Sequence, residues 1–322
     1  MSVAELEGLT FRPWAEGDDL RLLEVWGGPR TPQAHEDRAM LRPSSDEPFA
    51  RCIVAELDDV PIAAGVVYSS SLHPQRYWFY VEVASGERRQ GIGHQLFALL
   101  KAELPEGAQL KARYTAAAAG ENPDADGAAG FLAAEGFGLI NKSMLVVVEP
   151  SALPLPEFAE DGLVLEEAAT GSVELSTLVA EFYNATHAWD PSTMTVGLTQ
   201  TMLLGPHTGA KGAVVVRDRA MGEGAPILAF AVSYEPARPD APTEVLLGWN
   251  PELDEDRAAQ ACRDLLAMLV HQFPVQLEVD TAMVPLGRVI DELGPKGLAT
   301  IVTTTNICLL YTSDAADDLL TV

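Results

Sequence analysis

The stretch Val83–His94, with the sequence VASGERRQGIGH, decides how the rest of the chain is interpreted. The residues before it, Arg76–Val83, are rich in aromatic and β-branched side chains and predict a strand. The residues after it, Ile92–Leu104, place their large apolar side chains on one stripe and predict an amphipathic helix. The stretch is therefore expected to be a loop that leads from a strand into the start of a helix.

The chemistry of this loop is that of an anion site. Gly91 and Gly93 have no side chains, so the backbone can adopt positive φ angles and approach a ligand closely. The first N–H groups of the following helix have no partner within the helix, and the helix dipole favours negative charge there. Arg88 and Arg89 add positive charge. The loop predicts a phosphate or pyrophosphate site, with a structural turn carrying solvated arginines as the alternative.

With strand, Arg-x-x-Gly-x-Gly and helix in this order, residues 9–148 resemble the GNAT acyltransferase superfamily. The acyl-CoA signature of that family, Arg/Gln-x-x-Gly-x-Gly/Ala, falls on Arg88, Gly91 and Gly93, and its upstream apolar strand residue falls on Val83. A later family pattern, Phe-Tyr-x-x-x-Gly-Phe, is matched by FLAAEGF at residues 131–137, where Leu132 replaces the tyrosine.

The resemblance implies a fold and a set of ligand contacts. The fold is α/β (α+β), with mixed, mostly antiparallel sheets and flanking helices. The implied co-substrate is acetyl-CoA or another acyl-CoA, and no metal is implied. Backbone groups of Val81 and Val83 are expected to bind the pantetheine arm and to polarise the thioester carbonyl. The pyrophosphate is expected on the loop and the helix start, at Arg88, Arg89, Gln90, Gly91, Ile92, Gly93 and His94.

Leu132 bears on how the CoA thiolate leaves. The family often has a tyrosine there as general acid, and leucine has no proton to give. Tyr114, at the end of a predicted strand, is the candidate substitute, and a tyrosine of the core or rim is the alternative reading. Unassisted departure is also open, because a thiol is a much better leaving group than an alcohol.

Transfer to an amine requires a neutral nucleophile, so a base or a water chain should remove a proton. Glu82 lies in the aromatic strand beside the expected thioester, where burial would raise the pKa of its carboxyl. The alternative is that Glu82 points to solvent or pairs with an arginine. His73, before Pro74 in a predicted loop, is a second candidate base, with an exposed loop histidine as its alternative.

Composition excludes several other classes of protein. The chain has 322 residues, and its 47 Asp and Glu against 21 Lys and Arg give a net charge of −26. Such acidity argues against general binding to nucleic-acid backbones or anionic membranes. The start of the chain is acidic and lacks the apolar core of a signal peptide. Three scattered cysteines fit a reducing compartment and predict buried small side chains, so we expect a cytoplasmic protein.

The order of predicted elements in the first half returns in the second half, so the sequence predicts two tandem domains. We expect a catalytic GNAT domain at residues 1–150, a linker at 151–162 and a degenerate GNAT-like domain at 163–310. The second domain has no Gly-x-Gly, and carboxylates of Glu252–Asp256 stand where a pyrophosphate would need donors. A metal site there is less favoured than a solvated helix start. Residues 311–322 resemble a non-native tail.

These residues lead to a functional expectation. We expect an acyl-CoA-dependent N-acyltransferase that acetylates a small amine by direct transfer, with Glu82 and Tyr114 as the candidate catalytic residues. A non-catalytic acyl-CoA-binding sensor or regulatory module is the alternative, because of Leu132 and the degenerate repeat. We expect neither nucleic acid nor membrane as partner, and a monomer or homodimer.

Overall fold

The computed structural model describes residues 6–116, 123–157, 162–222, 224–236, 238 and 240–310, and the predicted tail lies outside this part. The described residues form two compact units. The first takes residues up to Thr115, those of Pro123–Ile140 and those from Ile307 onward, and the second takes those of Asn141–Asn306. The order of predicted elements leads us to expect contiguous domains, but two long strands, at residues 137–148 and 299–310, each contribute residues to both units.

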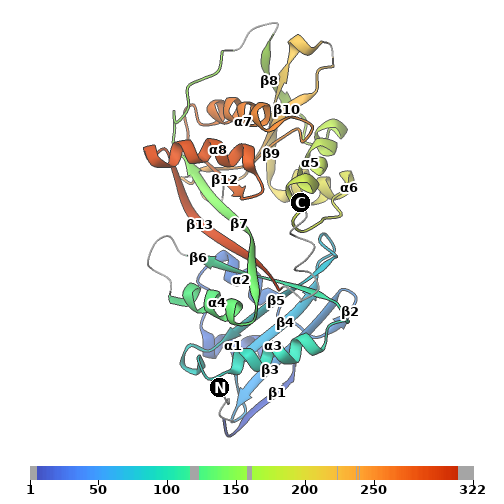
Figure 1. Cartoon of the computed structure of the whole chain (residues 1–322), viewed down its shortest axis with the longest axis vertical. Coiled ribbons are helices and arrows are strands. Elements are labelled where there is room, and N and C mark those ends of the chain that lie inside the picture. The colour runs from blue at the N-terminus through green and yellow to red at the C-terminus, as the bar shows by residue number, and fades with distance from the viewer. Residues whose placement is uncertain are drawn as a thin grey trace. The chain divides into compact units, whose positions relative to one another are not determined.

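The first unit contains a sheet with helices on both faces (Figure 1). Its helices are α1 (Asp18–Trp26), α2 (Pro32–Ala39), α3 (Ile92–Ala102) and α4 (Pro123–Ala134), with a 3₁₀ turn η1 (Ser85–Glu87). Its strands are β1 (Leu9–Pro13), β2 (Ser45–Asp46), β3 (Phe49–Leu57), β4 (Val60–Ser69), β5 (Arg76–Val83), β6 (Gln109–Ala116) and parts of β7 (Phe137–Val148) and β13 (Ala299–Leu310).

The strands of the first unit follow the order β1-β3-β4-β5-β6-β13-β7. The pairs from β1 to β5 are antiparallel, and β5 pairs with β6 in parallel. One face packs on α1 through Leu22, Val66 and Tyr68. The opposite face packs on α3 and α4, where Phe79 lies in a cluster with Phe97 and Leu132. The expected mixed, mostly antiparallel sheet with flanking helices is confirmed.

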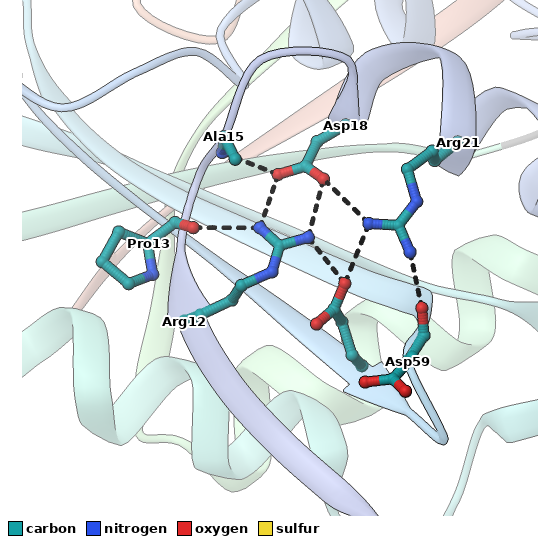
Figure 2. Close-up of polar contacts among 7 residues, drawn as sticks. Arg12, Pro13, Ala15, Asp18, Arg21 and Asp59 are labelled. Atoms are coloured by element: carbon teal, nitrogen blue, oxygen red, sulfur yellow. Dashed lines mark hydrogen bonds and ion pairs between the residues drawn. The ribbon is translucent and has the colours of Figure 1, made fainter.

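A charged network fastens the start of α1 to the sheet (Figure 2). Asp18 is 1% exposed and accepts hydrogen bonds from Arg12 at 2.7 and 2.8 Å and from the Ala15 N–H at 2.7 Å. Arg12 and Arg21 also donate to Glu56 of β3. Burial acts to raise the pKa of Asp18, but the hydrogen bonds and the two arginines lower it overall. The hydrogen bond from Arg12 likewise lowers the pKa of Glu56.

The second unit repeats this architecture, with strand order β13-β7-β12-β11-β10-β9-β8. Its strands are β8 (Leu163–Ala168), β9 (Ala210–Asp218), β10 (Ile227–Tyr234), β11 (Thr243–Trp249) and β12 (Val275–Asp280), besides parts of β7 and β13. Its helices are α5 (Val173–Thr186), α6 (Val196–Thr199), α7 (Glu255–Leu269) and α8 (Val284–Leu293), with a π turn η2 (Gln200–Leu204) and 3₁₀ turns η3 (Pro206–Thr208), η4 (Arg219–Met221) and η5 (Gly294–Lys296).

Burial patterns agree with several expectations. Cys52, Cys262 and Cys308 are free and buried, which confirms them as core side chains. Part of the predicted linker joins the core of the second unit, because Ala152 and Leu153 are buried in its apolar cluster. No helix in the described part of the chain has the length and apolar character needed to cross a membrane.

Candidate functional site

Strands β5 and β6 separate before either strand ends. Their parallel register runs from Arg76↔Gln109 to Phe79↔Ala112. Strand β5 continues to Val83 and β6 continues to Ala116. Among the described residues, the two strands form no pair beyond Phe79↔Ala112. The backbone edge of β5 after Phe79 is therefore not used by β6.

The unused edge of β5 belongs to Val81 and Val83. The Ala84 N–H donates to the Ile62 carbonyl of β4 at 2.8 Å. Because backbone groups alternate from side to side along a strand, those of Glu82 also face β4, and those of Val81 and Val83 face away from it. The Val83 carbonyl accepts a hydrogen bond from Arg88 Nε at 3.0 Å. This leaves the Val81 groups and the Val83 N–H directed to the side where β5 and β6 separate.

The predicted anion loop turns sharply into α3. Arg89 has φ 67°, and Gly91, the residue before the helix, has φ 84° and ψ −1°. No side chain caps this helix start, so its first N–H groups stay available to a ligand. A Cβ added at Gly93 would lie 3.3 Å from the Phe131 ring of α4. Because α4 packs this closely, glycine is the residue that fits best at position 93.

Charged and polar side chains surround this helix start. Arg88 and Arg89 are exposed, and Gln90 Nε2 donates to Glu87 at 2.9 Å. His94, in the first turn of α3, pairs through Nδ1 with Glu135, and its ring lies 5.2 Å from that of Phe131. The structure thus brings the loop residues predicted for pyrophosphate binding together around one uncapped helix N-terminus.

Glu82 projects from β5 toward α2 rather than toward α3. Arg38 of α2 donates to both carboxylate oxygens, from Nε at 2.8 Å and from Nη2 at 2.6 Å. The Tyr80 hydroxyl donates to Oε2 at 2.6 Å. Of the alternatives that the sequence leaves open for Glu82, the arginine pair is the one that the structure contains. The expected isolated, partly buried carboxylate is absent because Arg38, 44 residues earlier, reaches it.

Tyr114 lies on β6 past the last β5–β6 pair, and it packs against the cluster that contains Leu132. Burial, together with the nearby Cys308, raises the pKa of the Tyr114 phenol. The hydroxyl therefore keeps its proton at neutral pH. Leu132 itself is 5% exposed and belongs to the core. Tyr114 is thus a proton-bearing group on the same face of the sheet as the leucine that replaces the usual acid.

A comparison with protein-family models gives a match over the part of the chain that contains these features. The model described as the Acetyltransferase (GNAT) family matches residues 19–131, a range that contains the separating strands and the loop before α3. Residues 19–131 form a GNAT acetyltransferase-family domain. No curated protein sequence matches the chain significantly.

Solved structures extend the GNAT likeness over both units. A GCN5-related N-acetyltransferase from Sphaerobacter thermophilus has 15% identity and TM-score 0.57, covering 94% of this chain and 95% of that one. A tandem GNAT protein from the clavulanic acid biosynthesis pathway has 16% identity and TM-score 0.54, with 94% and 98% coverage. A probable N-acyltransferase from Enterococcus faecalis has 9% identity and TM-score 0.51, with 94% and 71% coverage. At these identities the likeness concerns the fold, which is that of a tandem GNAT protein.

The equivalent helix start in the second GNAT-like unit is capped, whereas the start of α3 in the first unit is not. Helix α7 follows β11 as α3 follows β5. Asp254 Oδ1 accepts a hydrogen bond from the Arg257 N–H at 2.9 Å, which caps α7, and Asn250 Oδ1 accepts one from the Glu252 N–H at 2.9 Å. The acidic segment is therefore a capped helix start, and the Asp254 carboxylate takes up one of the N–H groups that an anion would need.

The α2 face of the GNAT domain carries further charged residues that are not among the predicted site residues. Arg113 of β6 donates to Asp37 of α2 at 2.8 and 3.0 Å, beside the pair of Arg38 with Glu82. The alternation of Tyr80 and Glu82 along β5 could have placed these two on one face. Nothing local in the sequence identifies their partners on α2.

Proposed function

We propose that the first unit is an acyl-CoA-dependent N-acyltransferase that transfers an acetyl group directly to a small amine. The observation that carries this proposal is the separation of β5 from β6 beside the uncapped start of α3. Strand β5 offers a backbone edge for a pantetheine arm, and the start of α3 offers N–H groups for a pyrophosphate. GNAT-family membership of residues 19–131 supports the choice of acyl-CoA as the co-substrate.

The pyrophosphate would bind the N–H groups of residues 89–94. These groups surround Gly91, whose positive φ turns the backbone toward the ligand side of the helix start. Arg88 and Arg89 would add charge, and the hydrogen bond from Arg88 to the Val83 carbonyl holds its guanidinium next to the loop. Donors of this kind fit an anion, and no carboxylate caps them, in contrast to Asp254 on α7.

The thioester carbonyl would face the backbone of Val81. An N–H on the free side of β5 can donate to the carbonyl oxygen and stabilise the negative charge that develops when the amine attacks. The fixed strand geometry, held by β4 on the other edge, keeps this donor in place throughout the reaction. Direct transfer then needs no nucleophile on the protein.

Two proton transfers complete the proposed reaction. Tyr114 would give its proton to the departing CoA thiolate, because its phenol is protonated and lies on β6 beyond the last β5–β6 pair. Glu82 would accept the proton of the amine, and it can do so only by exchanging a hydrogen bond from Arg38 or Tyr80 for one from the acceptor.

The test is turnover of acetyl-CoA with a panel of small primary amines, followed by release of free thiol and by mass spectrometry of the products. N-acetylated product that depends on the protein supports the proposal. Tight CoA binding with no turnover for any amine would overturn it and favour the non-catalytic sensor, for which buried Leu132 in place of the usual tyrosine is the specific observation.

A further inference from the structure

The side chain of Arg88 reaches back from the loop before α3 to the last residue of β5. The 3₁₀ turn η1 begins at Ser85, and the Glu87 N–H donates to the Ala84 carbonyl at 2.9 Å. This turn brings Arg88 back toward the strand, so that its Nε donates at 3.0 Å to the carbonyl oxygen of Val83, five residues earlier. A hydrogen bond from one of its own arginines therefore joins the loop to the strand.

This hydrogen bond lies on the edge of β5 that is proposed to bind the pantetheine arm. The Val83 carbonyl points away from β4, because the next backbone group, the Ala84 N–H, donates to the Ile62 carbonyl of β4. A donor to the Val83 oxygen must therefore stand on the other side of the strand, where β5 and β6 separate. The guanidinium of Arg88 thus lies where an arm that pairs with Val83 would have to lie.

The contact between Arg88 and the Val83 carbonyl is of a kind that a phosphate group can displace. Arg88 is exposed, so water competes for its hydrogen bond to this neutral oxygen. A guanidinium binds phosphate more strongly than it binds a neutral acceptor, because the hydrogen bonds are charge-assisted on both sides and can be bidentate. The N–H groups proposed for the pyrophosphate begin at the next residue, Arg89. A rotation of one exposed side chain is therefore enough for Arg88 to change partners.

We propose that Arg88 couples the two halves of the CoA site: it holds the Val83 carbonyl until CoA binds, and it releases this carbonyl to an amide N–H of the pantetheine arm when its guanidinium moves onto the pyrophosphate. The inference rests on the proposed binding of acyl-CoA by the first unit. Pantetheine alone has amide groups but no phosphate, so it must compete with Arg88 for the carbonyl. CoA has both groups, and its pyrophosphate draws the arginine away from the strand edge. Arg88 therefore favours intact CoA over fragments that lack the pyrophosphate.

The second unit uses the residue at the same distance after its strand in a different way. Strand β11 pairs with β10 as β5 pairs with β4, and it ends at Trp249. The residue five positions later is Asp254, whose carboxylate accepts a hydrogen bond from the Arg257 N–H and caps α7. The arginine contact to the strand edge and the uncapped helix start thus occur together, in the unit that is proposed to bind CoA.

The experiment compares Arg88→Met with Arg89→Met, a matched control that removes the same charge from the same exposed loop and also keeps an unbranched side chain. Binding of CoA to the full chain is measured by calorimetry, and binding of pantetheine by ligand-observed NMR. Both variants should bind CoA about five- to twentyfold more weakly than the wild type, because each loses a cation beside the pyrophosphate. Only Arg88→Met should bind pantetheine more tightly, by about three- to tenfold, because the Val83 carbonyl then has no competing donor.

The sign of the change in pantetheine affinity separates this proposal from a purely structural role of Arg88, which would weaken the binding of both ligands. Loss of folding is not expected, because both positions are exposed, and the midpoints of thermal unfolding should stay within about 2 °C of the wild type. Pantetheine binding that is unchanged or weaker in Arg88→Met would overturn the proposal, as would an equal gain in Arg89→Met. A wild-type protein that does not bind CoA would instead overturn the proposed function, and this inference with it.

Discussion

Replacing Gly91 by glutamate tests the proposed anion site at the start of α3. The new side chain would stand at the turn where the pyrophosphate is expected. For two unit charges about 5 Å apart at an effective dielectric constant of about 20, repulsion amounts to about 3 kcal/mol. One such pair suffices to weaken CoA binding by more than about 100-fold. The substitution also strains the backbone, because φ is 84° at this position.

The chain offers a matched control for that strain. Gly17 precedes α1 with φ 88° and ψ −3°, and Gly91 precedes α3 with φ 84° and ψ −1°. A Cβ at Gly17 would meet no heavy atom within 4 Å. Gly17→Glu and Gly91→Glu should therefore each lower the free energy of unfolding by about 1–2 kcal/mol. Only Gly91→Glu should lose CoA.

The assay is isothermal titration calorimetry with CoA, paired with urea unfolding of both variants. Equal stability and unequal CoA affinity would show that the helix start acts through the ligand and not through the fold. Retention of CoA affinity within about threefold of the wild type in folded Gly91→Glu would refute the reasoning. So would an equal loss of affinity in Gly17→Glu.

Three further substitutions and one control substitution address the proposed proton transfers and the network of Figure 2. Tyr114→Phe should lower kcat by about 10- to 100-fold with CoA affinity unchanged, and Tyr77→Phe, in the same cluster, should leave both unchanged, as measured by thiol release. Glu82→Gln should lower kcat by about tenfold or more with CoA affinity unchanged; an unaltered kcat would exclude Glu82 as the base. Asp18→Asn should lower the free energy of unfolding by about 2 kcal/mol at pH 7. Because the folded-state pKa of Asp18 is lowered, that difference should shrink as the pH falls below about 4, in urea titrations at several pH values.

Local features of the fold were predictable because their signals are local. The predicted strand Arg76–Val83 has the observed bounds, and α3 begins at Ile92 as its apolar stripe indicates. The anion loop combines glycines, arginines and a helix start within twelve residues of sequence. Each of these residues acts on its near neighbours, so their order alone carries the information.

The α2 face of the site was not predictable in the same way. The carboxylate of Glu82 has different chemistry when isolated than when Arg38 and Tyr80 hold both of its oxygens. Which of these applies depends on where α2 packs, and that helix is joined to β5 by contacts across 44 residues of sequence. The type of a side chain therefore indicated its candidate role, but its hydrogen-bond partners could be identified only from the tertiary structure.

Strand β13 shows the same limit at the level of topology. Its apolar pattern predicts a strand over residues 298–309, and the observed strand is Ala299–Leu310. A strand between two others has both backbone edges paired, and its pattern of side chains does not say which strands are its neighbours. Here β13 lies between β6 and β7, and Cys308 and Leu310 complete the cluster around Phe97 in the first unit. Since the entropy of closing a loop grows only slowly with its length, distance along the sequence gives little ground to exclude such a partner. A division of the chain by sequence ranges therefore cannot reveal that the first core includes residues near the other end of the chain.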